Sequence, residues 1–182
     1  VTALERLFVA EVLEQDPKAK SINQALGGYG AGVAAVAAMH ARVRKGAGLA
    51  NEKRGMHVVF VAHADVETMR LPDADDYMRY SLRLPPKSMP PYVDDVDVVG
   101  FLRLVTFTKG DDGERKKAIS TGDRELVCHA VASNISKNRY GLTEALPFAA
   151  GENPLFAVIP ALGAKHAIAA KPRDGAAQKE GE

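Results

Sequence analysis

Several features that carry function in other proteins are scarce in this chain of 182 residues. It has one cysteine, Cys128, and no tryptophan. A single thiol excludes an internal disulfide framework and a cysteine-based zinc site, which indicates a reducing compartment. Because the residues around Cys128 are apolar, the pattern favours a buried small hydrophobe over a nucleophile. The 5 histidines match no zinc spacing.

The chain also lacks a strong net charge and a long hydrophobic run. Lys and Arg number 24 against 23 Asp and Glu, so the formal net charge is +1. No overall basic field therefore indicates nucleic acid. No apolar run approaches the roughly 18 residues of a transmembrane helix, and no signal-peptide pattern opens the chain. We expect no membrane partner and a cytoplasmic location.

A third absence concerns phosphate chemistry. No Gly-x-x-x-x-Gly-Lys-Ser/Thr occurs in the sequence, so the chain has no P-loop to cradle phosphates. Residues 30–35, Gly-Ala-Gly-Val-Ala-Ala, match the dinucleotide fingerprint Gly-x-Gly-x-x-Ala. That fingerprint needs a strand directly before it, and residues 18–26 have no strand pattern. A dinucleotide-dependent enzyme is therefore the weakest alternative.

What is present begins with two predicted helices. Residues 2–5, Thr-Ala-Leu-Glu, fit a capping box, and apolar residues then recur at helical spacing to about Gln15. An alanine-rich stretch predicts a second helix over residues 32–45. Gly46 and Gly48 are expected to end or loosen it.

Strand patterns dominate the rest of the chain. Residues 58–61, Val-Val-Phe-Val, are continuous and apolar, as expected for a central strand buried on both faces. Residues 77–84 alternate, which predicts a half-buried strand or hairpin arm with Met78, Tyr80, Leu82 and Leu84 on its apolar face. Further predicted elements are strands at 96–108, 116–120 and 126–131 and a hairpin turn at 110–113. This order is mixed α/β.

The most informative stretch is the cation motif, residues 136–141, Ser-Lys-Asn-Arg-Tyr-Gly. A turn here can aim Lys137 and Arg139 at one phosphate-sized anion. Lysine supplies a mobile charge and arginine a planar fork, and together they suit a terminal phosphate whose charge grows during cleavage. A solvated surface turn is the alternative that these residues alone leave open.

This motif carries a resemblance that extends along the chain. Lys-Asn-Arg-Tyr-Gly resembles the Lys-Asn-Arg-Phe-Gly of RadA-type proteins and the Lys-Asn-Lys of RecA. From residue 1 to about residue 148 the sequence resembles the RecA-like, AAA-type ATPases of bacteriophages, which are linked to single-strand annealing and recombination. The resemblance includes residues 1–7, Val-Thr-Ala-Leu-Glu-Arg-Leu, 55–63, Gly-Met-His-Val-Val-Phe-Val-Ala-His, and 77–84, Tyr-Met-Arg-Tyr-Ser-Leu-Arg-Leu.

The resemblance implies a fold and a place within it. We expect the distal part of a RecA-like P-loop NTPase sheet, with flanking helices and an added β-hairpin region. In that family the segment like residues 1–7 follows a strand that ends in a magnesium-binding Asp. Residues 1–164 would then be the C-terminal portion of the core, without its Walker A loop and its Walker B Asp. The composition of residues 165–182 predicts a disordered tail.

The resemblance also implies a function. The complete protein would bind ATP and Mg²⁺ between subunits of a homo-oligomer, with Lys137, Asn138 and Arg139 at a neighbour's nucleotide. Lys137 and Arg139 would act in trans like arginine fingers. His63 falls at the sensor position, at the end of the predicted central strand. The protein would act in DNA recombination or replication in a bacterial host cell, with phage recombination proteins as candidate partners, and this chain alone would be an inactive ATPase.

Two predicted loops correspond in order to the DNA-binding loops of RecA-like proteins. Residues 16–31 predict a mobile loop, and residues 64–91 contain the second. Their basic side chains could neutralise the phosphates of single-stranded DNA, with tyrosines as stacking surfaces. The candidates are Lys18, Lys20, Arg70, Arg79, Arg83 and Lys87. Nearby aspartates would repel DNA, so scattered surface cations remain an alternative, as does a non-catalytic binding or assembly module.

The acidic residues predict no metal site. Asp94, Asp95 and Asp97 lie among valines at the entry of a predicted strand. A solvated strand edge explains them better than a cation site, whose ligands must converge from several directions. Asp65 is interpreted as a solvated loop residue, so no metal ligand is assigned.

Overall fold

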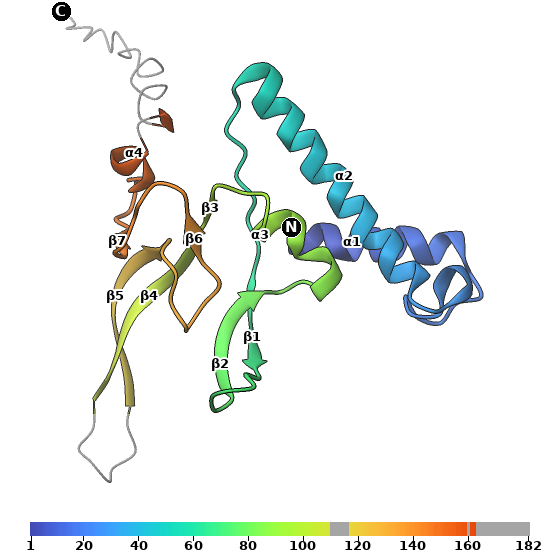
Figure 1. The fold of residues 1–182 in the computed structure, drawn as a ribbon, viewed down its shortest axis with the longest axis horizontal. Helices are drawn as coiled ribbons and strands as arrows, with labels where there is room; N and C mark the ends of the chain where they lie inside the picture. The colour runs from blue at the N-terminus through green and yellow to red at the C-terminus, as the bar shows by residue number, and fades with distance from the viewer. Residues whose placement is uncertain (110–116, 160, 163–182) are drawn as a thin grey trace, which may run out of the picture.

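The structure is a computed structural model that describes residues 1–109, 117–159 and 161–162. Two long helices lie on one side of the molecule, and the strands follow them along the chain (Figure 1). The helices are α1 (Thr2–Gln15), η1 (Ala25–Gly27), α2 (Ala31–Arg54), η2 (Pro86–Ser88), α3 (Pro90–Val93) and α4 (Leu155–Val158). The strands are β1 (Ala64–Met69), β2 (Tyr77–Leu82), β3 (Val98–Val99), β4 (Phe101–Lys109), β5 (Lys117–Val127), β6 (Lys137–Asn138) and β7 (Leu146–Pro147). The turn expected at 110–113 and the tail expected at 165–182 lie outside the described residues.

Helix α1 has the predicted extent but not the predicted cap. Its N-cap is Val1, without a side-chain hydrogen bond, so the capping box is wrong. Thr2 Oγ1 instead accepts a hydrogen bond from the His63 backbone N–H at 3.0 Å. Glu5 Oε2 lies 2.8 Å from His40 Nε2. Both side chains of the expected cap therefore join distant parts of the chain to α1.

Helix α2 continues through both glycines that were expected to end it. The chain leaves the helix only at Gly55, in the left-handed conformation with φ of 60°. The predicted end near residue 45 is wrong because an interior glycine costs a helix only about 1 kcal/mol. Because α2 is already nucleated and buries Val36 and His40, the helix continues past the glycines despite this cost.

The apolar core lies between α1, η1 and α2. Val12, Ala25 and Val36 form its buried centre, and Phe8, Ile22 and other apolar side chains pack around it. Ala25 belongs to the segment 16–31, which was expected to be a mobile loop. That segment is a loop, but it is anchored in the core through Ala25.

A buried polar network joins α3 to the helices. His40 is fully buried, with Nδ1 2.7 Å from the Tyr92 hydroxyl and Nε2 2.8 Å from the Glu5 carboxylate. Burial, and secondly the charge of Glu5, raise the pKa of Tyr92 above its usual value. The sequence analysis missed this network because its members come from three separate elements.

The segment of residues 57–62, between α2 and β1, contradicts the prediction of a buried central strand. It belongs to no strand of the structure, and Val59 and Val61 are 83% and 75% exposed. Phe60 turns inward, with its ring centroid 5.1 Å from that of Tyr92. Within the described part of the chain, the backbone of residues 58–60 makes no hydrogen bond. The strand prediction fails because no described strand pairs with this apolar run.

Strands β1 and β2 form an antiparallel hairpin in which Val66 pairs with Tyr80. The predicted strand at 77–84 is confirmed as far as Leu82. Its apolar face is the open one, because Met78 and Tyr80 are 72% and 46% exposed, whereas Ser81 on the other face is buried. The prediction was wrong for Met78, Tyr80 and Ser81, whereas Leu82 is partly buried. It also had a loop where β1 forms.

The strand predicted at 96–108 is interrupted at Gly100, which separates β3 from β4. A Cβ at Gly100 would lie only 2.9 Å from Leu126 Cδ1 on β5, so this close approach favours glycine. Strand β5 runs without a break through residues 117–120 and 126–127 of the next two predicted strands, whereas residues 128–131 belong to no strand, and residue 116 lies outside the described residues. Cys128 follows it and is buried, as predicted, and burial raises the pKa of its thiol.

Helices and sheets together confirm a mixed α/β protein. Strand β4 pairs with β5, β5 with β7, and β3 with β6, all antiparallel. A RecA-like P-loop sheet stays a prediction. None of the helices in the described residues has the length and apolar composition needed to cross a bilayer.

Candidate functional site

The cation motif begins as a strand and ends as a turn. Lys137 and Asn138 form β6 and pair with β3, and Gly141 turns the chain with φ of 72°. Lys137 Nζ donates to the Asp94 carbonyl at 2.8 Å. Arg139 Nη1 lies 3.0 Å from Asp97 Oδ1, and both side chains are more than half exposed. The turn predicted for the whole motif is therefore only its second half.

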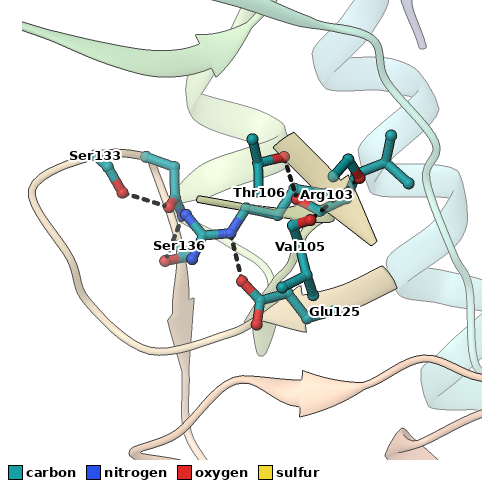
Figure 2. A network of polar contacts seen from close by, with 9 residues as sticks. Arg103, Val105, Thr106, Glu125, Ser133 and Ser136 are labelled. Atoms are coloured by element: carbon teal, nitrogen blue, oxygen red, sulfur yellow. Dashed lines mark hydrogen bonds and ion pairs between the residues drawn. The ribbon is translucent and has the colours of Figure 1, made fainter. Parts of the chain in front are cut away.

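A small polar network holds the segment that leads into this motif. Figure 2 shows Ser133 and Ser136 as parts of this network. The Ser133 hydroxyl donates to Asn134 Oδ1 at 3.1 Å. The Asn134 amide donates to Ser136 Oγ at 2.9 Å, and the Ser136 hydroxyl donates to the His129 carbonyl. Tyr80 on β2 also pairs with this turn through its backbone N–H and carbonyl. The residue before Lys137 is thus fixed from two directions.

Asn138 organises the motif from within. Its Nδ2 donates to the carbonyls of Cys128 and Leu142, at 2.8 and 2.9 Å. Its Oδ1 accepts from the backbone N–H groups of Tyr140 and Leu142, at 3.0 and 2.9 Å. The amide therefore holds the turn that carries Arg139, and its predicted contact with a nucleotide stays a prediction.

Arg139 opens onto a shallow pocket between α2 and the segment that follows α3. The pocket has a volume of about 430 Å³ and is lined by Ala41, Arg44, Lys45, Pro91, Asp95 and Arg139. Arg44 Nη2 donates to the Asp95 carbonyl. Three cations thus surround one hollow, with one carboxylate among them.

The sequence analysis missed Arg44 and Lys45. Both lie on α2, far along the chain from the cation motif. The basic run Arg42-Val43-Arg44-Lys45 was visible in the sequence, but it had the pattern of a solvated helix end. Only the packing of α2 against the segment of Asp94 and Asp95 brings two of these cations to Arg139.

His63 does not end a buried strand, because residues 58–61 form no strand. It is exposed, and its carbonyl accepts a hydrogen bond from the Arg83 N–H at 2.8 Å. In the part of the chain that the structure describes, no hydrogen bond, ion pair or ring contact joins His63 to Lys137 or Arg139. The strand-end position was wrong, and a sensor role stays a prediction from the resemblance.

The six candidate DNA-binding cations divide into two groups. Three are arginines that face acids of the β1–β2 hairpin region: Arg70 with Asp76, Arg79 with Glu67, and Arg83 with Asp65. The tightest of these pairs, Arg79 with Glu67, has an N–O distance of 2.7 Å. Asp65, which the sequence predicted to be a solvated loop residue, is exposed but also pairs with Arg83. The lysines of the set, Lys18, Lys20 and Lys87, are exposed and make no ion pair with a described residue.

The two predicted DNA-binding loops approach each other at Gly30. A Cβ placed on Gly30 would lie 3.6 Å from Lys87 Nζ, which brings a cation of the second loop to the first. Tyr29 beside it is fully exposed, with a left-handed backbone φ of 49°. The stacking role expected of the tyrosine in this loop stays a prediction from the sequence.

The glycine fingerprint at residues 30–35 lacks the context of a dinucleotide site. Gly30 is the N-cap of α2 in the left-handed conformation, and the element before it is the short helix η1 rather than a strand. No group of three His, Cys, Asp or Glu side chains within the described ranges could hold a metal ion.

Comparison with known proteins gives one family. A family model described as an AAA domain matches residues 1–140. This range includes α1, α2, the β1–β2 hairpin and the cation motif as far as Tyr140. No curated protein and no solved structure matches the chain.

Proposed function

The chain belongs to the AAA domain family of ATPase-like nucleotide-binding domains, and we propose that it is the C-terminal portion of a RecA-like ATPase core. Its Lys137 and Arg139 contact the phosphates of ATP bound by a neighbouring subunit. The observation that carries this proposal is the position of Arg139, whose exposed side chain lines a hollow with Arg44 and Lys45. An exposed cation at a concave site suits an anion presented by another molecule.

The chemistry follows from charge. When the terminal phosphate of ATP is transferred, negative charge spreads over its oxygens, and cations placed there lower the barrier. Lys137 donates to a carbonyl, which carries no net charge, whereas Arg139 is paired with the Asp97 carboxylate, which an incoming phosphate must displace. The resemblance assigns the Mg²⁺ that accompanies ATP to the complete protein.

Replacement of Arg139 tests the role in hydrolysis. In the complete protein that contains this chain, Arg139→Ala should lower ATP turnover about a thousandfold or more, the effect of losing an arginine finger. Arg103→Ala is the matched control, because Arg103 is also a half-exposed arginine in an ion pair, with Glu125. Equal turnover in the two variants would refute the proposal.

A mixing experiment tests whether the cations act across an interface. An Arg139→Ala protomer mixed with a protomer lacking the P-loop lysine should regain ATP turnover. Activity should return at those interfaces where the intact P-loop of one protomer meets the intact Arg139 of the other. If mixed oligomers form but show no ATP turnover, Arg139 does not act in trans.

We also propose that the protein acts on single-stranded DNA in phage recombination. Exposure of Tyr29 beside Lys87 supports this, because a stacking ring next to cations is the typical single-strand surface. Tyr29→Ala should weaken binding of a single-stranded oligonucleotide about tenfold, since one stacked base contributes about 1–3 kcal/mol. Tyr140→Ala, another exposed tyrosine, is the control, and equal effects of both variants would contradict the assignment.

A non-catalytic assembly module is the second candidate. The exposed valines of the 57–62 segment favour it, because uncovered apolar surface drives association. The coding sequence upstream of Val1 discriminates the two candidates. An in-frame P-loop followed by a strand ending in Asp supports the ATPase, and the absence of both supports the module.

A further inference from the structure

The hollow beside Arg139 carries more positive charge than the cation motif supplies. Arg44 and Lys45, from α2, line it together with Arg139. Asp95 is the acidic side chain of this lining, so cations exceed carboxylates three to one. Such an excess in a concave site concentrates anions.

Arg44 has an unsatisfied donor at this site. Its Nη2 donates to the Asp95 carbonyl, but its Nε is buried without a hydrogen-bond partner. A buried N–H that lacks an acceptor destabilises the protein. Because this Nε is buried, an anion oxygen in the hollow reaches it only if the Arg44 guanidinium turns toward the hollow, and the oxygen would then supply the missing acceptor.

The segment of residues 94–97 orients the cations without neutralising them all. Lys137 is held by the carbonyl of Asp94 and Arg44 by the carbonyl of Asp95. Only Arg139 is held by a carboxylate, that of Asp97. Because carbonyls carry no net charge, an incoming anion has to compete with a single ion pair, which is exposed and therefore weak.

We propose that this hollow is a binding site for the terminal phosphate of a polyphosphate, in which Arg44 is a direct contact in addition to Arg139. This inference rests on the proposed function for the identity of the polyphosphate as ATP. A terminal phosphate carries about two charges at one point, and cations that converge on one hollow match it. The phosphates of a nucleic acid are singly charged and spread along the strand, so they match a track of cations instead.

The test uses the chain as it stands and inorganic triphosphate as the probe. Calorimetric titration should show binding in the millimolar range, since the chain has no P-loop. Arg44→Ala should weaken this binding about tenfold or more, because a charge-assisted hydrogen bond and a full charge are lost. Arg42→Ala is the matched control: Arg42 lies two residues earlier on α2, is exposed, and is not part of the lining.

A second variant changes affinity in the opposite direction, so misfolding cannot imitate it. Asp95→Asn removes the carboxylate of the lining but leaves the carbonyl that holds Arg44. It should tighten triphosphate binding about threefold or more, through loss of one repulsive charge. Equal affinity in the wild type, Arg44→Ala and Asp95→Asn would overturn the inference.

Two further outcomes separate this inference from the proposed function. If Arg44→Ala abolishes triphosphate binding while Arg139→Ala spares ATP turnover in the complete protein, the site stands and its role in hydrolysis falls. If a single-stranded oligonucleotide displaces triphosphate at equal phosphate concentration, the hollow belongs to a nucleic-acid track, and the polyphosphate assignment is wrong.

Discussion

Two neighbouring regions of this molecule treat their apolar side chains in opposite ways. In the helical region, formed by α1, η1 and α2, Val12 and Val36 are almost fully buried. In the 57–62 segment Val59 and Val61 project into solvent. The segment has the more apolar sequence of the two, so local hydrophobicity did not decide which region became the core.

The difference lies in how each region satisfies its backbone. A helix satisfies its hydrogen bonds internally, so α1 and α2 need only each other to bury a face. A strand needs a neighbouring strand for both backbone and side chains. The 57–62 segment has no such neighbour among the described residues, and it therefore stays open. This openness favours assembly with another polypeptide.

The largest expected effect tests the difference between the helical region and the 57–62 segment directly. Val36→Asp places an unpaired charge in the core and should lower the free energy of unfolding by about 3 kcal/mol or more. Val59→Asp, at an exposed position, should change it by less than about 0.5 kcal/mol. Urea denaturation followed by circular dichroism measures both.

Light scattering extends the same pair of variants to association. We expect the wild-type chain to self-associate as its concentration rises, and Val59→Asp to reduce this, because the charge interrupts an apolar edge. A wild-type chain that stays monomeric at all concentrations would contradict the inference drawn from the exposed valines.

Two glycines of α2 sharpen the account of the helical region. A Cβ at Gly32 would overlap the Ile22 carbonyl oxygen, whereas a Cβ at Gly46 would meet no atom within 4 Å. Gly32→Ala should therefore destabilise the protein by about 1–3 kcal/mol, and Gly46→Ala should stabilise it by up to about 1 kcal/mol. Thermal melting of the two variants should show shifts of opposite sign, and shifts of the same sign would argue against this packing of α2.

The buried network of Tyr92 should give a pH-dependent effect of similar or smaller size. Tyr92→Phe leaves His40 Nδ1 without its partner and should cost about 1–3 kcal/mol at neutral pH. Burial first and Glu5 second raise the pKa of Tyr92 in the folded protein. Its contribution is thus fully present below the unfolded pKa of about 10 and is lost as pH rises through the folded pKa.

Urea titrations on both sides of pH 10 measure this dependence. The stability difference between the wild type and Tyr92→Phe should shrink as the solution becomes more alkaline. A difference that stays constant would show that the phenol is not held in its protonated form by the fold.

A small effect on stability is also expected in the cation motif. Arg139→Ala removes an exposed ion pair with Asp97 and should change stability by less than about 1 kcal/mol. A loss as large as that of Val36→Asp would mean that Arg139 supports the fold, and its proposed contact with a phosphate would lose its basis.

Much of the local structure was predictable from the sequence, and the reasons are physical. The extent of α1, the alternating strand that became β2 and the burial of Cys128 depend on patterns within a few residues. The end of α2, the capping box and the face of β2 were wrong because each was decided by distant partners. His40, Glu5 and Tyr92 show this most clearly, since nothing near any of them in the sequence indicates the other two.

The candidate site divides in the same way. The cation motif and its pairing of lysine with arginine were visible as a short sequence pattern, and the AAA family match agrees with the resemblance at the level of the family. Arg44 was not predictable, because a helical arginine becomes part of a site only when the helix packs beside it.

The sequence by itself determined the extent of α1 and the start of α2, which residues carry the cations, and that no P-loop lies in the chain. Only the tertiary structure decided that the valines of the 57–62 segment face solvent and that His40 is buried between Glu5 and Tyr92. It also decided that Arg44 of α2 lines the same hollow as Arg139. The physical reason is that periodicity and propensity act over a few residues. Burial and charge convergence depend instead on which distant surfaces meet.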